Sequence, residues 1–167
     1  DMRFDQTKGQ TAKDLIRKSS EKELADIIYQ FGEERKSRRI SNSIKKIKNL
    51  STTMDLKEAI RKSTPPHHRN KTHARVFQAI RIAVNDEIDK LKSFLKIFLD
   101  YLEIGGRLVV ISYHSIEDRI VKHSFRQLNN ESKVELLTKK PLTPSTDEIK
   151  LNKRSRSAKM RALERVL

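Results

Sequence analysis

The stretch Gly105–Lys122, GGRLVVISYHSIEDRIVK, decides the fold. Its apolar run, Leu108–Ile111, is short and rich in β-branched residues, which predicts a strand buried on both faces, as in a parallel sheet flanked by helices. The two glycines before the run are typical of the left-handed cap past a helix end. After the run, Ser115 and Asp118 resemble an N-cap pair that opens a helix. The stretch is therefore predicted to form a strand, a polar tip and a helix.

Polar and ionisable residues follow the predicted strand directly. In open α/β sheets, ligands bind in the crevice outside the carboxyl ends of the strands, so this tip is a candidate for chemistry. The alternative is a purely structural role, in which Ser115, Glu117 and Asp118 only cap the following helix. Capping is the commoner use of such residues, and the residue types alone leave both interpretations open.

Charge is the strongest signal in the composition. The 167 residues include 37 lysines and arginines against 22 acidic residues, a net charge of +15. This excess favours a polyanionic partner, nucleic acid before membrane, and no apolar run approaches the roughly 20 residues of a membrane span. The lack of cysteine excludes disulfides and thiolate chemistry and suits an intracellular protein. Because the chain begins at Asp1, with neither an initiator methionine nor a signal-peptide pattern, we expect it to be part of a longer protein.

An all-helical unit is predicted for residues 11–63. Thr11, Ser20 and Thr53 are each expected to cap a helix. Residues 35–48 contain seven lysines or arginines and no acid, arranged around a stripe of isoleucines. This pattern predicts a basic helix that faces the phosphates of a nucleic acid, each contact adding a salt-dependent increment to binding. A basic face that is merely solvated is the alternative.

Two features follow this unit. Residues 65–73, PPHHRNKTH, are predicted to form a flexible basic loop, and no metal site is expected because no cysteine or carboxylate stands at ligand spacing from the histidines. Residues 76–91 predict a long helix, on which Gln78, Arg81 and Asn85 share one face. These three polar side chains either read a nucleotide or link the helix to a neighbouring loop.

The last part of the chain predicts short strands and a basic tail. Strands are expected at Val134–Leu137 and near Ser157–Leu163, and residues 152–161 are basic throughout. Small or apolar residues alternate there with Lys159 and Arg161, which favours a strand with one solvated or RNA-facing side.

Six segments, in one order along the chain, resemble the 16S rRNA (cytosine-N4)-methyltransferase family of bacteria and organelles. They are DMRFD at 1–5, YQFGEER at 29–35, FQAIRIAVN at 77–85, the stretch at 105–122, TKKP at 138–141 and RSRSAK at 154–159. Tyr113, Ile116 and Lys153 depart from the phenylalanine, leucine and proline that the family usually carries. The larger departure concerns the glycine-rich turn that holds the cofactor in such enzymes, because the four glycines of this chain form no such cluster.

The resemblance implies the fold class α/β, with a partial class I methyltransferase (Rossmann-like) sheet and an inserted all-helical domain. Residues 1–10 would form a loop next to the active site, residues 11–70 a helical insertion that recognises RNA, and residues 71–167 the C-terminal half of the methyltransferase domain. The cofactor, S-adenosylmethionine, would be bound mainly by an N-terminal half outside this chain. No cofactor-binding residue and no metal ligand is therefore expected within it.

The implied reaction is S-adenosylmethionine-dependent N4-methylation of a cytosine in 16S rRNA, with this fragment inactive alone. The exocyclic amine is a poor nucleophile, so the site must position it and accept its proton. Asp1 and Asp5, beside the expected acceptor pocket, are the catalytic candidates together with His114. The alternatives are that the aspartates pair with Arg3 and shape the loop, and that His114 only fixes a loop through a hydrogen bond.

RNA contacts are expected from the basic helix, the polar helix face and the basic tail. The candidates are Arg38, Arg39, Lys45, Lys46, Lys48, Gln78, Arg81, Asn85, Arg154, Arg156 and Lys159. The implied partner is 16S rRNA or the small ribosomal subunit, in the cytoplasm or, if the source is eukaryotic, in an organelle. A target base inside a stacked helix would have to be presented unpaired or flipped out. The rival hypothesis is a non-enzymatic, ribosome-associated RNA-binding helical module, which has no need for the strand and polar tip at 105–118.

Overall fold

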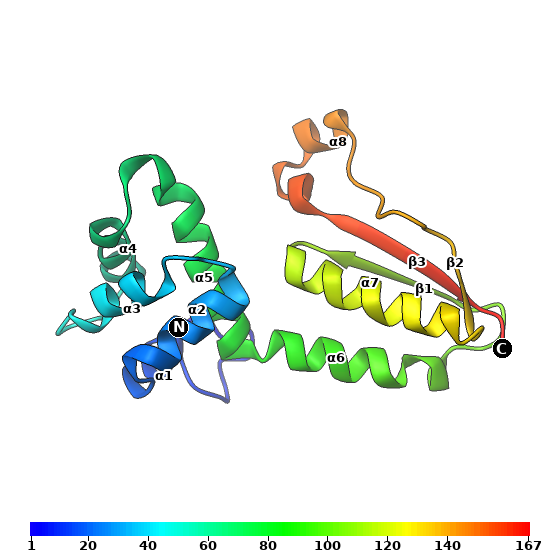
Figure 1. Ribbon diagram of the computed structural model, residues 1–167, viewed down its shortest axis with the longest axis horizontal. Coiled ribbons are helices and arrows are strands. Elements are labelled where there is room, and N and C mark those ends of the chain that lie inside the picture. Colours follow the sequence, from blue (N-terminus) through cyan, green and yellow to red (C-terminus); the bar gives the residue numbers. More distant parts are fainter. The chain divides into compact units, whose positions relative to one another are not determined.

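The computed structural model describes residues 1–167, which form two compact units, Asp1–Glu87 and Ile88–Leu167 (Figure 1). The first unit is entirely helical and the second packs helices on a small β-sheet, so the chain as a whole is mixed α/β. The division lies after Glu87 and not near residue 70, because helix α5 (Arg69–Asn85) packs along α2 (Glu21–Gly32) within the first unit.

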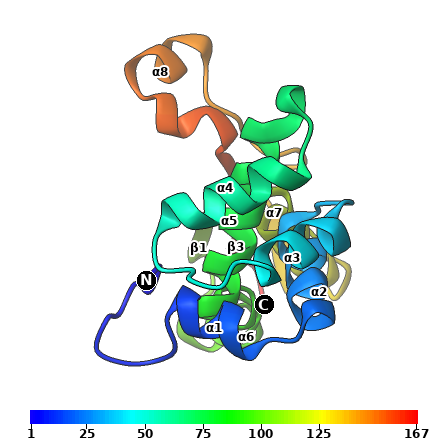
Figure 2. The same ribbon diagram turned by 90° about the vertical axis from the view of Figure 1, so that its left-hand side faces the viewer.

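The helices of the first unit are labelled in Figure 2, and three of them begin with a capping box. In each, a hydroxyl accepts the N–H of the third helical residue, whose acid bonds back to the cap. The caps are Thr11, Ser20 and Thr52; Thr53 is the first helical residue, because Asp55 stands three residues after Thr52. The elements of this unit are α1 (Ala12–Lys18), α2, α3 (Ser37–Lys45), α4 (Thr53–Ser63), the 3-10 helix η1 (Pro66–His68) and α5.

Buried aliphatic side chains from all five α-helices of this unit form one core. Its fully buried members include Leu24, Ile28, Ile40, Ile44, Ile60, Val76 and Ile80. The isoleucines of the basic segment 35–48 thus point inward, which confirms the predicted amphipathic helix, although α3 ends at Lys45.

The FGEER motif holds α2 against α5. Gly32 marks the close approach, since a Cβ there would lie 2.7 Å from the carbonyl oxygen of Arg75. Just beyond α2, the buried Glu34 carboxylate accepts hydrogen bonds from the Thr72 hydroxyl at 3.2 Å and from Arg75 at 3.4 Å. The motif therefore has a structural role in this unit.

Two predictions for the middle of the chain are wrong. Residues 65–73 are no flexible loop: they form η1 and the first turn of α5, and Pro66 supplies the preset φ of a first helical turn. The long helix predicted over 76–91 is two helices, α5 and α6 (Glu87–Ile97). Asp86 separates them, because it takes the left-handed conformation at φ 51° and ends α5.

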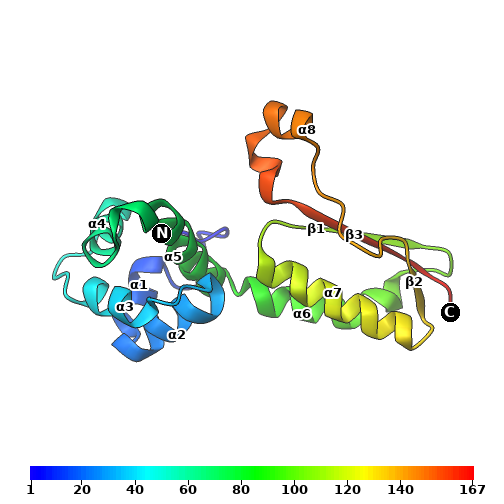
Figure 3. The same ribbon diagram turned by 45° about the horizontal axis from the view of Figure 1, so that its top comes forward.

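The second unit contains a three-stranded sheet of order β1-β3-β2, with both pairings antiparallel. Val110 lies opposite Arg161, and Leu136 opposite Leu163. Helices α6 and α7 lie on one face of this sheet (Figure 3), and the core between them contains Leu95, Phe98, Val121, Phe125, Val134 and Leu163. The elements are α6, η2 (Phe98–Tyr101), β1 (Arg107–Ser112), α7 (Ser115–Asn130), β2 (Val134–Leu136), α8 (Thr146–Leu151), η3 (Lys153–Ser157) and β3 (Lys159–Arg165).

Strand β1 is buried on one face only. Leu108 and Val110 pack against the helices, while Val109 and Ile111 are 52% and 54% exposed. The prediction of a strand buried on both faces, as in a parallel sheet, is therefore wrong for this chain: its pairings are antiparallel and helices cover a single face. The predicted strand–tip–helix order is confirmed, and Gly105 takes φ 79° in the turn before β1.

The other two strands are confirmed with small shifts in their bounds. β2 ends at Leu136, one residue earlier than predicted. β3 runs from Lys159 to Arg165 and not from Ser157, because residues 153–157 form the 3-10 helix η3.

Candidate nucleic-acid interface

Asn85 holds the N-terminal loop against the end of α5. Its buried amide donates to the carbonyl oxygens of Met2 at 2.9 Å and Arg81 at 2.8 Å, and its oxygen accepts the N–H of Phe4 at 2.8 Å. Met2 takes φ 70°, a conformation that few non-glycine residues adopt. The hydrogen bonds to Met2 and Phe4 fix the backbone of residues 2–4 beside α5, and the bond to Arg81 lies within α5 and orients the Asn85 amide.

A cavity of about 580 Å³ lies between this loop and α5. We call it the loop cavity; it is lined by Met2, Arg3, Phe4, Ala74, Phe77, Gln78 and Arg81. Phe4 is 73% exposed. Aromatic faces, a guanidinium plane and an amide are the groups with which proteins stack and hydrogen-bond an unstacked base, so the chemistry of this cavity fits a nucleobase.

The predicted polar face of α5 links elements of the first unit. Gln78 donates to the Phe31 carbonyl at 3.0 Å, and Arg81 makes a bidentate pair with Glu87 at 2.8 and 2.9 Å. These contacts are the ones expected if the polar side chains link the helix to its neighbours. Gln78 and Arg81 also line the loop cavity, whereas Asn85 does not.

Asp1 and Asp5 make local contacts in the loop. Asp1 accepts two hydrogen bonds from the Arg3 guanidinium, at 2.7 and 2.9 Å. Asp5 accepts the hydroxyl and the N–H of Thr7, at 2.5 and 3.0 Å, and these hydrogen bonds lower the pKa of the Asp5 carboxyl. Both carboxylates therefore shape the loop, and neither lines the loop cavity.

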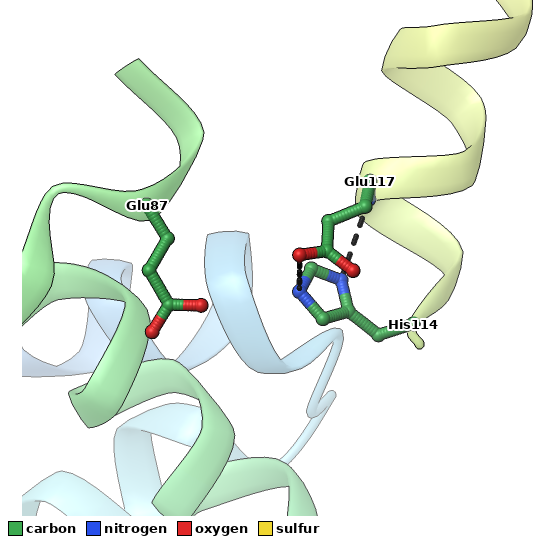
Figure 4. A group of neighbouring side chains, drawn as sticks. All are labelled: Glu87, His114 and Glu117. Carbon is green, nitrogen blue, oxygen red and sulfur yellow. Dashed lines mark hydrogen bonds and ion pairs between the residues drawn. The ribbon is translucent and has the colours of Figure 1, made fainter. Parts of the chain in front are cut away.

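His114 is the N-cap of α7 (Figure 4). Its buried Nδ1 accepts the N–H of Glu117 at 3.3 Å, and its Nε2 lies 3.3 Å from a carboxylate oxygen of Glu117. Glu117 also accepts the N–H of Tyr113 at 3.0 Å. Burial by itself raises the pKa of Glu117, but the hydrogen bonds from His114 and Tyr113 outweigh burial and lower it.

The predicted cap pair Ser115 and Asp118 is therefore wrong by one residue, since His114 and Glu117 hold those positions. A histidine nitrogen replaces the hydroxyl of the usual cap. These contacts are the ones expected if His114 only fixes the loop through a hydrogen bond.

Asp118 instead joins α7 to strand β3. Its carboxylate accepts the buried Arg161 guanidinium at 2.7 Å and the Lys159 ammonium at 3.3 Å. Burial by itself raises the pKa of Asp118, but the two cations outweigh it and hold the pKa below its ordinary value. The prediction that Lys159 and Arg161 form a solvated or RNA-facing side is wrong for Arg161, because that side of β3 packs on α7.

The basic residues of segment 35–48, which includes α3, and those of η3 differ in exposure and contacts. Arg38, Arg39, Lys46 and Lys48 are exposed, as are Arg154 and Arg156 on η3. Lys45 is half-buried and donates to the carbonyl oxygens of Ile16 at 2.6 Å and Arg17 at 3.3 Å, at the end of α1. The exposed cations are available to phosphates, whereas Lys45 also stabilises the helical unit.

The sequence did not name the partners in three structural contacts: the backbone of Met2 and Phe4 held by Asn85, the N–H of Glu117 capped by His114, and Asp118 paired with the buried Arg161. Each joins a polar group to a partner that no periodic pattern names. The only signal was the polar tip itself, where an acid stands three residues after His114 as well as after Ser115.

A family model described as the MraW methylase family matches residues 1–166. The chain belongs to the MraW methylase family. Among curated relatives, the ribosomal RNA small subunit methyltransferase H of Acaryochloris marina is 49% identical over 99% of this chain and 56% of its own length. Proteins of the same name from Thermosipho africanus and Synechococcus elongatus are 48% and 47% identical over 99% and 100% of the chain, and 57% and 56% of their own lengths.

The chain thus spans a little over half the length of the curated relatives it matches. The match runs through both structural units of this family member, from the N-terminal loop to β3. None of its helices has the length and apolar character needed to cross a membrane.

Proposed function

We propose that this chain is the acceptor-side part of an enzyme that methylates a cytosine of 16S rRNA at N4, with S-adenosylmethionine as the methyl donor. Membership of the MraW methylase family and the names of its relatives support rRNA methylation. The observation that carries the proposal is the loop cavity, an aromatic and polar pocket whose loop is fixed by Asn85.

The residues of this chain do not by themselves form an S-adenosylmethionine site. A glycine-rich strand-to-helix turn would let the cofactor approach the backbone. The turn from β1 to α7 carries Tyr113 and His114 instead, and the His114 side chain already accepts the N–H of Glu117 in the first turn of α7. The donor would therefore be held mainly by chain outside these residues, and the fragment would not transfer methyl groups alone.

Strand β1 offers a site where the part of the protein outside this chain could join the sheet. The order β1-β3-β2 leaves one edge of β1 unpaired, and the exposed Val109 and Ile111 leave one of its faces apolar. We infer that β1 continues into a larger Rossmann-like sheet in the whole protein.

In the loop cavity, the cytosine would stack on the exposed Phe4 ring, with Phe77 beside it. Gln78 and Arg81 would hold its polar edge and so direct N4 toward the donor. Methyl transfer to the amine gives a cationic nitrogen that must lose a proton. Asp1 or Asp5, which flank the loop residues that line the cavity, would accept it as ionised carboxylates, since a methylated cationic amine conjugated to the ring is a strong acid. His114 would act indirectly, by positioning the polar tip.

The exposed cations of α3 and η3 would grip the rRNA backbone, together with Lys159 at the start of β3. Their substrate would be 16S rRNA or the small ribosomal subunit, in the cytoplasm or an organelle. A second candidate is a non-enzymatic RNA-binding module, favoured by the separate core of the helical unit. It predicts RNA binding without any dependence of methylation on the loop cavity.

The test uses the full-length protein with small ribosomal subunits and labelled S-adenosylmethionine, and the product is identified by mass spectrometry of digested 16S rRNA. Phe4→Ala removes the stacking face, and we expect methyl incorporation to fall by about 5- to 150-fold, because the loss of stacking costs on the order of 1–3 kcal/mol. Tyr101→Ala is the matched control, an 83% exposed aromatic outside the cavity. Equal activity of both variants would remove the loop cavity from the reaction.

Cofactor binding is tested separately by calorimetric titration. We expect saturable binding of S-adenosylmethionine by the full-length protein and none by residues 1–167 alone. Micromolar binding by the shorter chain would show that the donor site has been misplaced.

A further inference from the structure

A second cavity, of about 440 Å³, lies between α1 and the segment that joins α3 to α4. We call it the basic pocket; its lining is Lys13, Ile16, Arg17, Ile44, Lys45, Ile47, Lys48, Asn49, Leu50 and Ser51. It shares no lining residue with the loop cavity, and the proposed acceptor chemistry makes no use of it.

Four cations and no carboxylate line the basic pocket. Lys13 and Arg17 come from α1, while Lys45 and Lys48 come from the end of α3 and the segment after it. The carbonyl end of a helix repels anions, but here the Lys45 ammonium covers it by bonding the carbonyl oxygens of Ile16 and Arg17. The pocket is therefore positive without a local negative pole.

Three acids near the pocket cations, Asp14, Glu23 and Asp55, are each engaged in the cap of a helix. Asp55 accepts the N–H groups of Ser51 at 3.0 Å and Thr52 at 2.7 Å and so caps α4. Its charge is directed at the helix N-terminus, and it is not part of the lining.

The floor of the pocket is apolar. Ile16 and Ile44 are buried, and Ile47 and Leu50 are partly buried against the core of the helical unit. The volume falls within the range of about 300–1,000 Å³ that is usual for small-ligand sites. An apolar surface framed by cations is the chemistry that holds an unstacked base together with its phosphate.

We propose that the basic pocket binds one unstacked nucleotide of a single-stranded stretch of the RNA substrate, with the base on the apolar floor and the phosphate among the lysines and Arg17. This proposal rests on the proposed function, because it takes RNA to be the substrate. The bound nucleotide differs from the methylated one, because the loop cavity receives the acceptor base. The pocket would thereby fix the register of the RNA strand on the helical unit.

The first test is RNA affinity of the full-length protein, measured by fluorescence anisotropy with a labelled oligouridylate over a series of salt concentrations. The pocket variant is Lys13→Gln with Arg17→Gln, both exposed on α1. We expect the slope of log affinity against log salt to fall by about 0.7 for each phosphate of a single strand that the variant no longer neutralises.

Lys22→Gln with Lys57→Gln is the matched control, since it removes two exposed lysines of the same unit outside the pocket. The control is expected to keep the parental slope. An equal change in both double variants would mean a diffuse basic surface and would overturn the proposal. Asn49→Asp, which puts a carboxylate on an exposed lining position, is expected to weaken binding several-fold, and an unchanged affinity would also count against it.

The second test separates a nucleotide site from a bare anion site. Methyl NMR signals of Ile47 and Leu50 are followed while cytidine monophosphate, or inorganic phosphate, is added to the full-length protein. The proposal expects both methyl signals to shift with the nucleotide and not with phosphate, because only a base covers the floor. Equal shifts would leave an anion site and refute base binding. Failure of the proposed function would look different: methylation of 16S rRNA would be absent while both pocket tests still succeeded.

Discussion

The ion pair between Asp118 and Arg161 is expected to be a main support of the second unit. Both side chains are about nine-tenths buried, and their closest atoms lie 2.7 Å apart. Asp118→Asn keeps the shape of the side chain but leaves the Arg161 charge uncompensated. Breaking a buried pair costs about 3–5 kcal/mol, and we expect the lower end of that range because the amide oxygen still accepts one hydrogen bond. Lys159 adds little, since its side chain is 39% exposed.

The pH dependence follows from the lowered pKa of Asp118. A carboxyl whose pKa is lower in the folded state stabilises the fold fully above its unfolded pKa and loses that contribution as the pH falls through the folded pKa. The difference between the parent and Asp118→Asn should therefore be greatest at neutral pH and shrink below about pH 4, near the ordinary pKa of aspartate.

The assay is urea unfolding of the chain followed by the methyl NMR signals of Val121 and Leu163, which report on the core of the second unit. Asp147→Asn is the control, because its ion pair with Lys150 is exposed and should contribute almost nothing. Adding Arg161→Met to Asp118→Asn should restore part of the missing stability, since no buried charge is then left unpaired. A destabilisation at neutral pH no larger than that of the control, or one that does not change with pH, would refute the reasoning.

Four other variants test the hold of Asn85 on the N-terminal loop, the packing of α2 against α5 and the two basic patches. Asn85→Ala removes the two hydrogen bonds to the N-terminal loop, so the amides of residues 2–4 should exchange faster by hydrogen exchange and methyl incorporation by the full-length protein should fall, whereas unchanged exchange would contradict the role of Asn85 in holding the loop. Gly32→Ala places a Cβ 2.7 Å from the carbonyl oxygen of Arg75. Thermal unfolding should show the helical unit destabilised by on the order of 1–3 kcal/mol, the cost of overpacking. An unchanged stability would mean that α2 and α5 move apart without cost. Arg38 and Arg39 are neutralised in one variant, and Arg154 and Arg156 in another; all four are exposed. In each variant, the slope of log rRNA affinity against log salt should fall by about 0.7 to 0.9 for every phosphate that is no longer neutralised. An unchanged slope would remove that patch from the interface.

Sequence alone determined the features that depend on neighbours within one or two turns. The capping boxes at Thr11 and Ser20 and the inward isoleucines of α3 follow from local spacing, and so does the strand Arg107–Ser112 with its polar tip. Short-range steric and hydrogen-bonding rules decide such elements, because the capping side chain and the N–H group that it accepts lie three residues apart. The family resemblance, carried by segments along the whole chain, was likewise readable from residue order and is confirmed by the family match.

Tertiary structure decided which partner each polar group bonds and which face of each strand or helix is buried. Asn85 reaches back to Met2 and Phe4, and Arg161 meets Asp118, across intervals that no helical or strand period describes. The exposed side of β1 follows from helices that cover a single face, which an apolar run cannot reveal. A hydrophobic pattern indicates how much apolar surface a segment must bury. Only the packing of the whole chain determines which element covers that surface and which charged group pairs with each polar side chain.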